Sequence, residues 1–185
     1  MTHSPQTQAL IDYLVAHSIR TDGPFLLRSG ERSDWYMDAR QTTYSGIGAR
    51  LVGAAVLEHV PEGIDAVGGM TMGADPIAVA TAIAAADDGR DIAAFSIRKE
   101  EKEHGTEGRL VGPVGPGAKV VVLEDTTTTG GALGEAVDVL QDSFVLTVLV
   151  IALVDRSNGA TAHAMERRGI DYIALTTPAD FGIET

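Results

Sequence analysis

The chain has 185 residues, the size of one ordinary domain, and a core of that size needs neither a disulfide nor a metal to hold it. It contains no cysteine, which excludes disulfides, thiolate catalysis and Cys-ligated zinc or iron–sulfur clusters. Its formal net charge of −12 opposes non-specific binding to nucleic acid or to an anionic membrane, whereas a local cluster of cations would still bind an anionic small molecule.

The first residues are polar and show no basic flank followed by an apolar run, so no secretory signal is visible. The longest apolar stretch, 144–154, is 11 residues long. A membrane-spanning helix needs about 20. We therefore expect a cytoplasmic protein that binds neither a membrane nor nucleic acid.

The first predicted helix starts at Ser4-Pro5, with serine as the N-cap and proline at the first helical position. Residues 25–38 then predict two short extended pieces around a Ser29-Gly30 turn. In an extended segment Trp35 and Tyr36 point to opposite sides, so only one of them can line a site, and the residues alone leave either one as a core residue. A second helix is expected from Ser45 to Pro61.

Strands and helices alternate through the rest of the chain. Strands that are apolar on both faces and alternate with helices predict an α/β fold with a mainly parallel sheet covered on both sides. The expected strands are 64–67, 92–97, 120–123, 145–154 and 170–175, and the expected helices are 75–86, 132–140 and 160–168. Ligands bind at the carboxyl ends of such strands, which directs attention to the loops after Val67, Ile97, Leu123 and Val154.

The loop after Ile97 is long and, at its start, basic. Residues 98–117 predict no regular structure, and loops of that length are usually functional or disordered. Arg98, Lys99, Lys102 and His104 lie within seven positions of an otherwise acidic chain. The run suits a solvated charged loop, but it also suits a flexible loop that closes on a diphosphate and excludes water.

The segment after Leu123 carries the strongest signal. A buried strand runs into Glu124 and Asp125, then four threonines and two glycines before a helix. Hydroxyls, glycine amides and a helix start make a cradle for a phosphate, while the carboxylates suit sugar hydroxyls or a hydrated Mg²⁺. The alternative is a solvated turn with acidic N-cap residues. Other phosphate motifs are missing, because the chain has no G-x-x-x-x-G-K-[ST] and no G-x-G-x-x-G after a strand.

The segment 120–131 resembles the phosphoribosyl-pyrophosphate (PRPP) binding motif of the type I phosphoribosyltransferases, in which apolar residues precede two acids and then threonines and glycines. The pattern R-K-E-x-K-x-H-G at 98–105 resembles the catalytic loop of the orotate phosphoribosyltransferase family. Residues 27–30 with 35–36, residues 69–76 and residues 154–156 also fit that family, in the expected order. The resemblance covers essentially the whole chain.

The resemblance implies a type I phosphoribosyltransferase fold in a single domain, 1–185, with a small N-terminal hood at about 1–40 and an α/β core at about 60–175. It implies transfer of the phosphoribosyl group of PRPP to orotate, giving orotidine 5′-monophosphate and pyrophosphate in pyrimidine (UMP) biosynthesis. Mg²⁺ is expected mainly through PRPP and water, with no direct protein ligand. A homodimer with shared active sites is implied, because the basic loop reaches into the neighbouring subunit's site in this family.

The resemblance also implies roles for single residues. The expected PRPP-binding residues lie in three loops: Thr71, Met72 and Gly73; Arg98, Lys99, Lys102 and His104; and Glu124, Asp125, Thr126, Thr127, Thr128, Thr129, Gly130, Gly131 and Ala132. The expected orotate contacts are Arg28, Tyr36, Thr128 and Arg156, with Trp35 as the alternative to Tyr36. The expected catalytic residues are Lys102 for the leaving group, His104 as a proton donor and Asp125 for the charge growing on the ribose.

The residues themselves agree with part of this reading. A guanidinium recognises the carboxylate of orotate, and Arg156 follows a strand end, although a surface ion pair is the alternative for it. The chain departs from the family in two places. Many relatives have a lysine where this chain reads Met72-Gly73-Ala74, and Arg28 stands where lysine is common.

Two other functions stay open from the sequence. One is a transferase for uracil or a purine, which the basic residues expected at the base disfavour, because those bases carry no carboxylate. The other is a PRPP-sensing regulator that binds nucleic acid, which the net charge of −12 disfavours.

Overall fold

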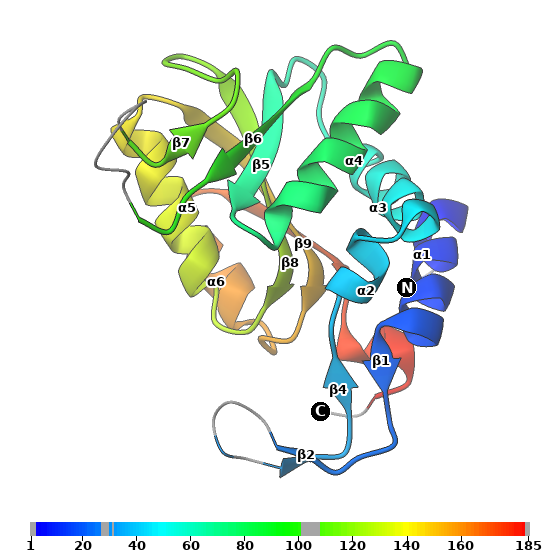
Figure 1. Ribbon diagram of the computed structural model, residues 1–185. Coiled ribbons are helices and arrows are strands. Elements are labelled where there is room, and N and C mark those ends of the chain that lie inside the picture. The colour runs from blue at the N-terminus through cyan, green and yellow to red at the C-terminus, as the bar shows by residue number, and fades with distance from the viewer. Residues whose placement is uncertain (1–2, 27–29, 31, 101–107, 184–185) are drawn as a thin grey trace.

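The computed structural model describes residues 3–26, 30, 32–100 and 108–183, and its centre is a six-stranded sheet (Figure 1). The strand order is β10-β9-β8-β5-β6-β7, and neighbouring strands are parallel except for β6 with β7. The strands are β5 (Ala66–Met70), β6 (Ala93–Ile97), β7 (Leu110–Val111), β8 (Lys119–Thr127), β9 (Leu146–Asp155) and β10 (Asp171–Thr176). The predicted mainly parallel sheet is confirmed.

Helices cover both faces of this sheet (Figure 1). One face packs against α3 (Gly46–Leu57) and α4 (Ala74–Asp87), with α1 (Pro5–His17) against α3; the other packs against α5 (Gly131–Asp142) and α6 (Ala160–Glu166). In β8, Val121 and Leu123 enter the first of these cores, whereas Val120 and Val122 enter the second. A strand buried on both faces has to be apolar at every position, which explains the continuous apolar run.

Two serines start the first two long helices, as predicted. The Ser4 hydroxyl accepts a hydrogen bond from the Thr7 amide at 3.1 Å, and the Ser45 hydroxyl accepts one from the Gly48 amide at 3.0 Å. The short helix α2 (Arg40–Thr43) was not predicted. A helix of one turn is too short to show an apolar periodicity in the sequence. Thr42 and Thr43 of this turn are buried and pack it against the rest of the domain.

The segment between α1 and α2 forms two small antiparallel pairs on the side where β8 and β9 end (Figure 1). β1 (Ile19–Arg20) pairs with β4 (Tyr36–Met37), and β2 (Phe25–Leu26) pairs with β3 (Arg32–Ser33). Extended structure was predicted here as two pieces within residues 25–38, and the structure divides this range into three short strands, β2, β3 and β4. Ser29 of the expected turn lies outside the described residues. We call residues 18–39 the hood.

Three boundaries differ from the expected ones. β5 runs through Gly68 and Gly69, which look like strand breakers in the sequence. They are needed because a Cβ at either position would lie 2.1 Å from a carbonyl oxygen of the next strand, Phe95 O or Leu123 O. β8 continues past Leu123 to Thr127, so the two acids and two threonines belong to the strand. Finally, β7 lies in the segment expected to be irregular, where it pairs with β6.

The C-terminal segment returns to the N-terminus. The 3₁₀ turn η1 (Pro178–Phe181) carries Asp180, whose Oδ1 lies 2.8 Å from Nε2 of His3.

Among the described residues, no helix combines the length and the apolar character that crossing a bilayer requires.

Candidate functional site

A cavity of about 540 Å³ opens where β5, β6 and β8 end, under the hood. Its volume suits a small phosphorylated metabolite. Four parts of the chain line it, and these residues are Tyr36, Met37, Asp38, Ala39 and Arg40; Met70, Thr71, Met72 and Gly73; Lys99 and Glu100; and Glu124, Asp125, Thr126, Ala132 and Glu135. The loops that follow three parallel strands thus meet at one place, as the strand order requires.

The carboxylates of Glu124 and Asp125 lie side by side in this cavity. Glu124 is only 8% exposed. Burial raises the pKa of the Glu124 carboxyl to about 8, and the neighbouring negative charge of Asp125 adds to this. At neutral pH Glu124 therefore holds a proton, and the pair presents one hydrogen-bond donor beside acceptor oxygens. That combination suits a pair of sugar hydroxyls.

Gly73 brings the β5–α4 loop into contact with Asp125. A Cβ built on Gly73 would lie 2.7 Å from the Asp125 Oδ1 atom. Only glycine lets the backbone of residues 71–73 approach this carboxylate so closely. The loop and the acidic pair therefore form one wall of the cavity.

The β8–α5 loop has the features of a phosphate cradle. Gly130 adopts a left-handed conformation (φ 75°) as the N-cap of α5 and has no side chain to cap the helix. The Thr129 hydroxyl accepts from the Gly131 amide at 3.3 Å, and the next two amides, of Ala132 and Leu133, have no acceptor among the described residues. The Thr127 hydroxyl accepts from the Gly130 amide at 3.2 Å and lies 2.9 Å from the Thr161 hydroxyl of α6. The loop is thereby fixed from behind, while Thr128 and Thr129 are exposed. Uncapped amides at a helix start are donors for an anion.

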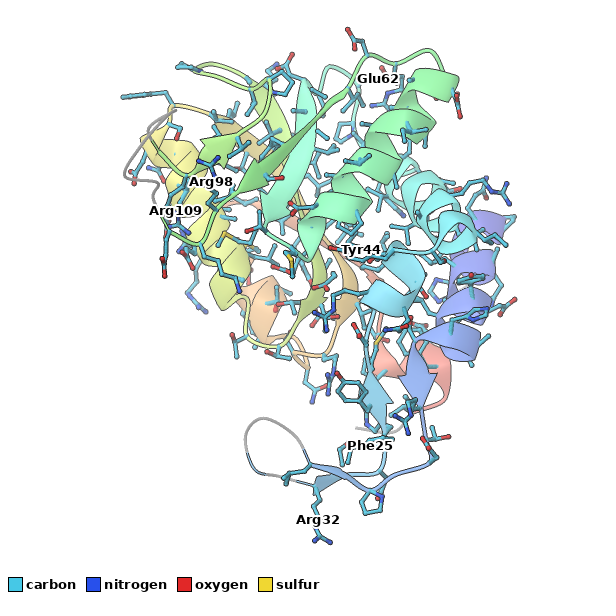
Figure 2. The ribbon with its side chains drawn as sticks, in the orientation of Figure 1. Phe25, Arg32, Tyr44, Glu62, Arg98 and Arg109 are labelled. Atoms are coloured by element: carbon cyan, nitrogen blue, oxygen red, sulfur yellow. The ribbon has the colours of Figure 1, made fainter. Side chains whose placement is uncertain are left out.

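The base of the long basic loop is fixed to the rest of the site by Arg109 (Figure 2). Its Nε donates to the Arg98 carbonyl at 2.6 Å, and the Arg98 amide donates to the Arg109 carbonyl at 2.8 Å. The guanidinium also forms an ion pair with Glu135 of α5. One residue thus connects both ends of the loop to the helix that starts at the phosphate cradle.

The two neighbouring aromatic residues of the hood have different environments. Tyr36 lines the cavity and is 41% exposed. Trp35 is partly buried against the core, and the Arg156 guanidinium lies over its ring, 4.4 Å from the centroid. Arg156 follows β9, and its amide donates to the Thr127 carbonyl at 2.8 Å. The sequence left open which aromatic residue faces the cavity, and Tyr36 is the one that lines it.

The Arg156 guanidinium has no carboxylate partner among the residues that the structure describes. Its neighbour Asp155 instead accepts from the Ser157 amide at 2.7 Å and from the Tyr172 hydroxyl at 2.9 Å. Burial lowers the pKa of Arg156, but an arginine remains charged. The surface ion pair considered as an alternative is therefore not formed within the described part of the chain.

Sequence reasoning missed Asp38, Arg40 and Glu135, all of which line the cavity. Asp38 and Arg40 follow the hood's last strand, and the available signal was a charged pair two residues apart directly after an extended segment. Nothing in the sequence placed Glu135, which occupies an ordinary exposed position of a helix.

The structure brings some of the predicted site residues together and leaves others apart. Those that line the cavity are Tyr36, Thr71, Met72, Gly73, Lys99, Glu124, Asp125, Thr126 and Ala132. Those beside it, in the cradle or at the strand ends, are Arg98, Thr127, Thr128, Thr129, Gly130, Gly131 and Arg156. Arg28, Lys102 and His104 lie outside the described residues.

The acidic pair offers oxygen atoms to a metal ion. Within residues 3–26, 30, 32–100 and 108–183, no three His, Cys, Asp or Glu side chains are grouped as a metal would need. Two adjacent carboxylates, one of them protonated at neutral pH, fit outer contacts to a hydrated Mg²⁺. The residues thus fit a magnesium ion that a phosphorylated ligand brings with it.

No family model matches the chain. A curated relative, the orotate phosphoribosyltransferase of Rhodopirellula baltica, is 40% identical over 169 residues, which is 88% of this chain and 87% of the relative. The crystal structure of Mycobacterium tuberculosis orotate phosphoribosyltransferase with Fe(III) dicitrate is 36% identical, with a TM-score of 0.87 over 97% of this chain and 100% of that chain. The same enzyme in complex with PRPP is 33% identical, with a TM-score of 0.82 over the same shares of the two chains.

Proposed function

Because this chain belongs to the orotate phosphoribosyltransferase family, we propose that the cavity under the hood is where it transfers the phosphoribosyl group of PRPP to orotate. The products are orotidine 5′-monophosphate and pyrophosphate, in pyrimidine biosynthesis. The observation that carries the location is the meeting of an acidic pair with an uncapped helix start, Glu124 and Asp125 with the start of α5. One phosphorylated sugar satisfies both, with its hydroxyls on the acids and its 5-phosphate on the amides.

The reaction is a displacement at the anomeric carbon of PRPP. A ring nitrogen of orotate forms the new bond and gives up its proton, while the carbon–oxygen bond to the diphosphate breaks and its electron pair leaves with that group. No covalent enzyme intermediate is needed, so the protein contributes by holding two substrates in line and by stabilising charge. Asp125 is proposed to face the positive charge that grows on the ribose.

The diphosphate is proposed to lie between the loop 71–73 and the basic loop. Lys99 lines the cavity on that side, and Lys102 and His104 are proposed to complete the charge around the leaving group. Lys102 is the first choice for stabilising the diphosphate, with His104 as a proton donor. Glu124 and Asp125 would make outer contacts to a hydrated Mg²⁺ brought by PRPP, and such an ion would add positive charge at the diphosphate when bound.

Orotate is proposed to lie between Tyr36 and the end of β9, with its carboxylate on the Arg156 guanidinium. Thr128 and Arg28 are the further proposed contacts. This assignment is supported by the Arg156 guanidinium, which forms no ion pair with a carboxylate of the described residues and is therefore available to a carboxylate of the ligand. The same feature disfavours uracil, adenine and hypoxanthine, which carry no carboxylate.

A homodimer is also proposed, with the basic loop of one subunit serving the site of the other. Four large apolar side chains at the start of α3 and along α4 support an interface there, because each is more than half exposed: Tyr44 (61%), Ile47 (60%), Val79 (52%) and Ile83 (60%). A groove of about 520 Å³ runs between α3 and α4 beside them. A second copy of the chain is the proposed occupant. The cytoplasmic location expected from the sequence stays a prediction.

The fall in orotate absorbance after PRPP and Mg²⁺ are added tests the function directly. We expect turnover with orotate and none with uracil, adenine or hypoxanthine under the same conditions. Turnover with uracil or a purine in place of orotate would reassign the base. No turnover with any of the four, together with tight PRPP binding, would favour a PRPP sensor.

A further inference from the structure

One guanidinium in the cavity belongs to none of the motifs that point to PRPP. Arg40 is the first residue of α2, directly after the hood, and it lines the cavity together with Met72, Gly73 and Asp125. Asp38 holds it in place, because its Oδ1 accepts from the Arg40 Nε at 2.7 Å and from the Arg40 amide at 3.2 Å. Asp38 is itself held by Gln41, whose side-chain amide donates to Oδ2 at 3.2 Å.

This anchoring uses one edge of the guanidinium and leaves the other available. Among the described residues, no acceptor is bound to the two terminal nitrogens of Arg40, and its side chain is 49% exposed. Two parallel N–H groups in a fixed plane are the donor geometry that matches two oxygens of a phosphate.

The charge balance of the cavity bears on the role of Arg40. The lining includes four carboxylates, of Asp38, Glu100, Asp125 and Glu135, besides the protonated Glu124, and two cations, of Arg40 and Lys99. The loop Thr71-Met72-Gly73 contributes no positive charge. A diphosphate on that loop would therefore meet a negative field unless a nearby cation offset it. Arg40 is the lining cation whose position is fixed by a partner within the hood.

We propose that Arg40 binds the diphosphate of PRPP across the cavity from the loop 71–73, with Asp38 as its positioning residue. This inference rests on the proposed function. The 5-phosphate has its own donors in the amides at the start of α5, and the orotate carboxylate has Arg156 beside Trp35. The diphosphate, by contrast, receives no side-chain cation from the loop 71–73, and Lys99 is the other lining cation proposed to meet it.

The test compares Arg40→Ala, Arg40→Gln and Arg40→Lys with wild type by steady-state kinetics and by calorimetric titration of PRPP with Mg²⁺. Arg40→Gln keeps a hydrogen-bond donor for Asp38, so it separates the loss of the positive charge from a loss of the hood structure. Arg20→Ala is the matched control. Arg20 lies on β1, is paired with Asp22 two residues on at 2.8 Å, and does not line the cavity.

We expect the PRPP KM and Kd to rise about 10- to 30-fold in Arg40→Ala and Arg40→Gln, the effect of losing a charged hydrogen-bond pair. Arg40→Lys should lie between them and wild type, because it keeps the charge without the planar fork. The orotate KM and the Arg20→Ala enzyme should change little. Unchanged PRPP binding in Arg40→Gln, or a rise in the orotate KM alone, would overturn the proposal. Wild-type protein that does not bind PRPP would instead refute the proposed function.

Discussion

At the scale of single residues, burial decides the protonation of the site. Glu124 is buried next to a second carboxylate, and its pKa of about 8 lies well above the ordinary value of 4.5. Since the folded form holds the proton more tightly than the unfolded chain, this group favours folding most below pH 4.5, and that contribution is lost as the pH rises towards 8.

We therefore expect Glu124→Gln to be more stable than wild type at pH 8 to 9 and to lose this advantage near pH 5. The difference should change between the two pKa values of Glu124, 4.5 in the unfolded chain and about 8 in the folded protein. Urea unfolding at several pH values measures the difference in the free energy of unfolding. Glu62→Gln, an exposed residue at the opposite end of the molecule from the hood (Figure 2), is the control and should show no such trend. A constant difference between wild type and Glu124→Gln across this range would contradict the assignment.

The contact between Trp35 and Arg156 makes a second residue-scale prediction. A cation over an aromatic ring contributes about 0.5–1 kcal/mol at partly exposed sites, so removing the ring in Trp35→Leu should raise the orotate KM about 2- to 5-fold. The PRPP KM should stay the same, and Trp35→Phe should restore part of the effect. If the KM values of both substrates rise together, Trp35 acts on the fold of the hood and not on Arg156.

At the scale of elements, close approach between the β5–α4 loop and β8 shapes the site. Gly73→Ala would place a methyl group against the Asp125 carboxylate and push it away from the proposed position of the ribose. We expect at least about a tenfold loss of kcat/KM for PRPP, in line with the cost of misplacing a positioned group. The melting temperature should change little.

Gly115→Ala is the control for this substitution, because a Cβ at Gly115 meets no atom within 4 Å and its φ is not positive. Equal activity of Gly73→Ala and wild type would show that the position of Asp125 is not critical for the reaction.

The helices and strands differ in how well the sequence alone predicts them. Long helices and buried strands were predictable, because serine caps and continuous apolar runs are local signals. The boundary of β5 was not, since Gly68 and Gly69 are explained only by backbone atoms of the neighbouring strands. β7 was missed for a related reason. A two-residue strand has no pattern of its own and exists through its pairing with β6.

The same distinction holds for the site. The acidic pair, the threonines and the glycines follow one another in the sequence, so a common site for them could be predicted before the fold was known. Asp38, at the end of the hood, and Arg40, at the start of α2, reach the cavity only through tertiary structure, as does the Arg109–Glu135 ion pair. Residues that act from separate elements leave no spacing signal in one sequence.

At the scale of the whole molecule, the proposed sharing of active sites between two subunits would make activity depend on assembly. We expect the double variant Ile47→Lys/Ile83→Lys to sediment as a monomer and to lose most of its turnover, because two charges would be buried at the proposed interface. Leu146→Lys is the control, since Leu146 is 56% exposed at the start of β9 and does not line the groove between α3 and α4. A double variant that still sediments as a dimer would place the interface elsewhere.

We propose that the end of β8 receives the phosphorylated sugar. A crystal structure of the protein soaked with ribose 5-phosphate tests this most directly. We expect the phosphate on the backbone amides of residues 126–132 and the sugar hydroxyls at Glu124 and Asp125. Well-ordered ribose 5-phosphate bound at another place, with nothing at the end of β8, would contradict the assignment.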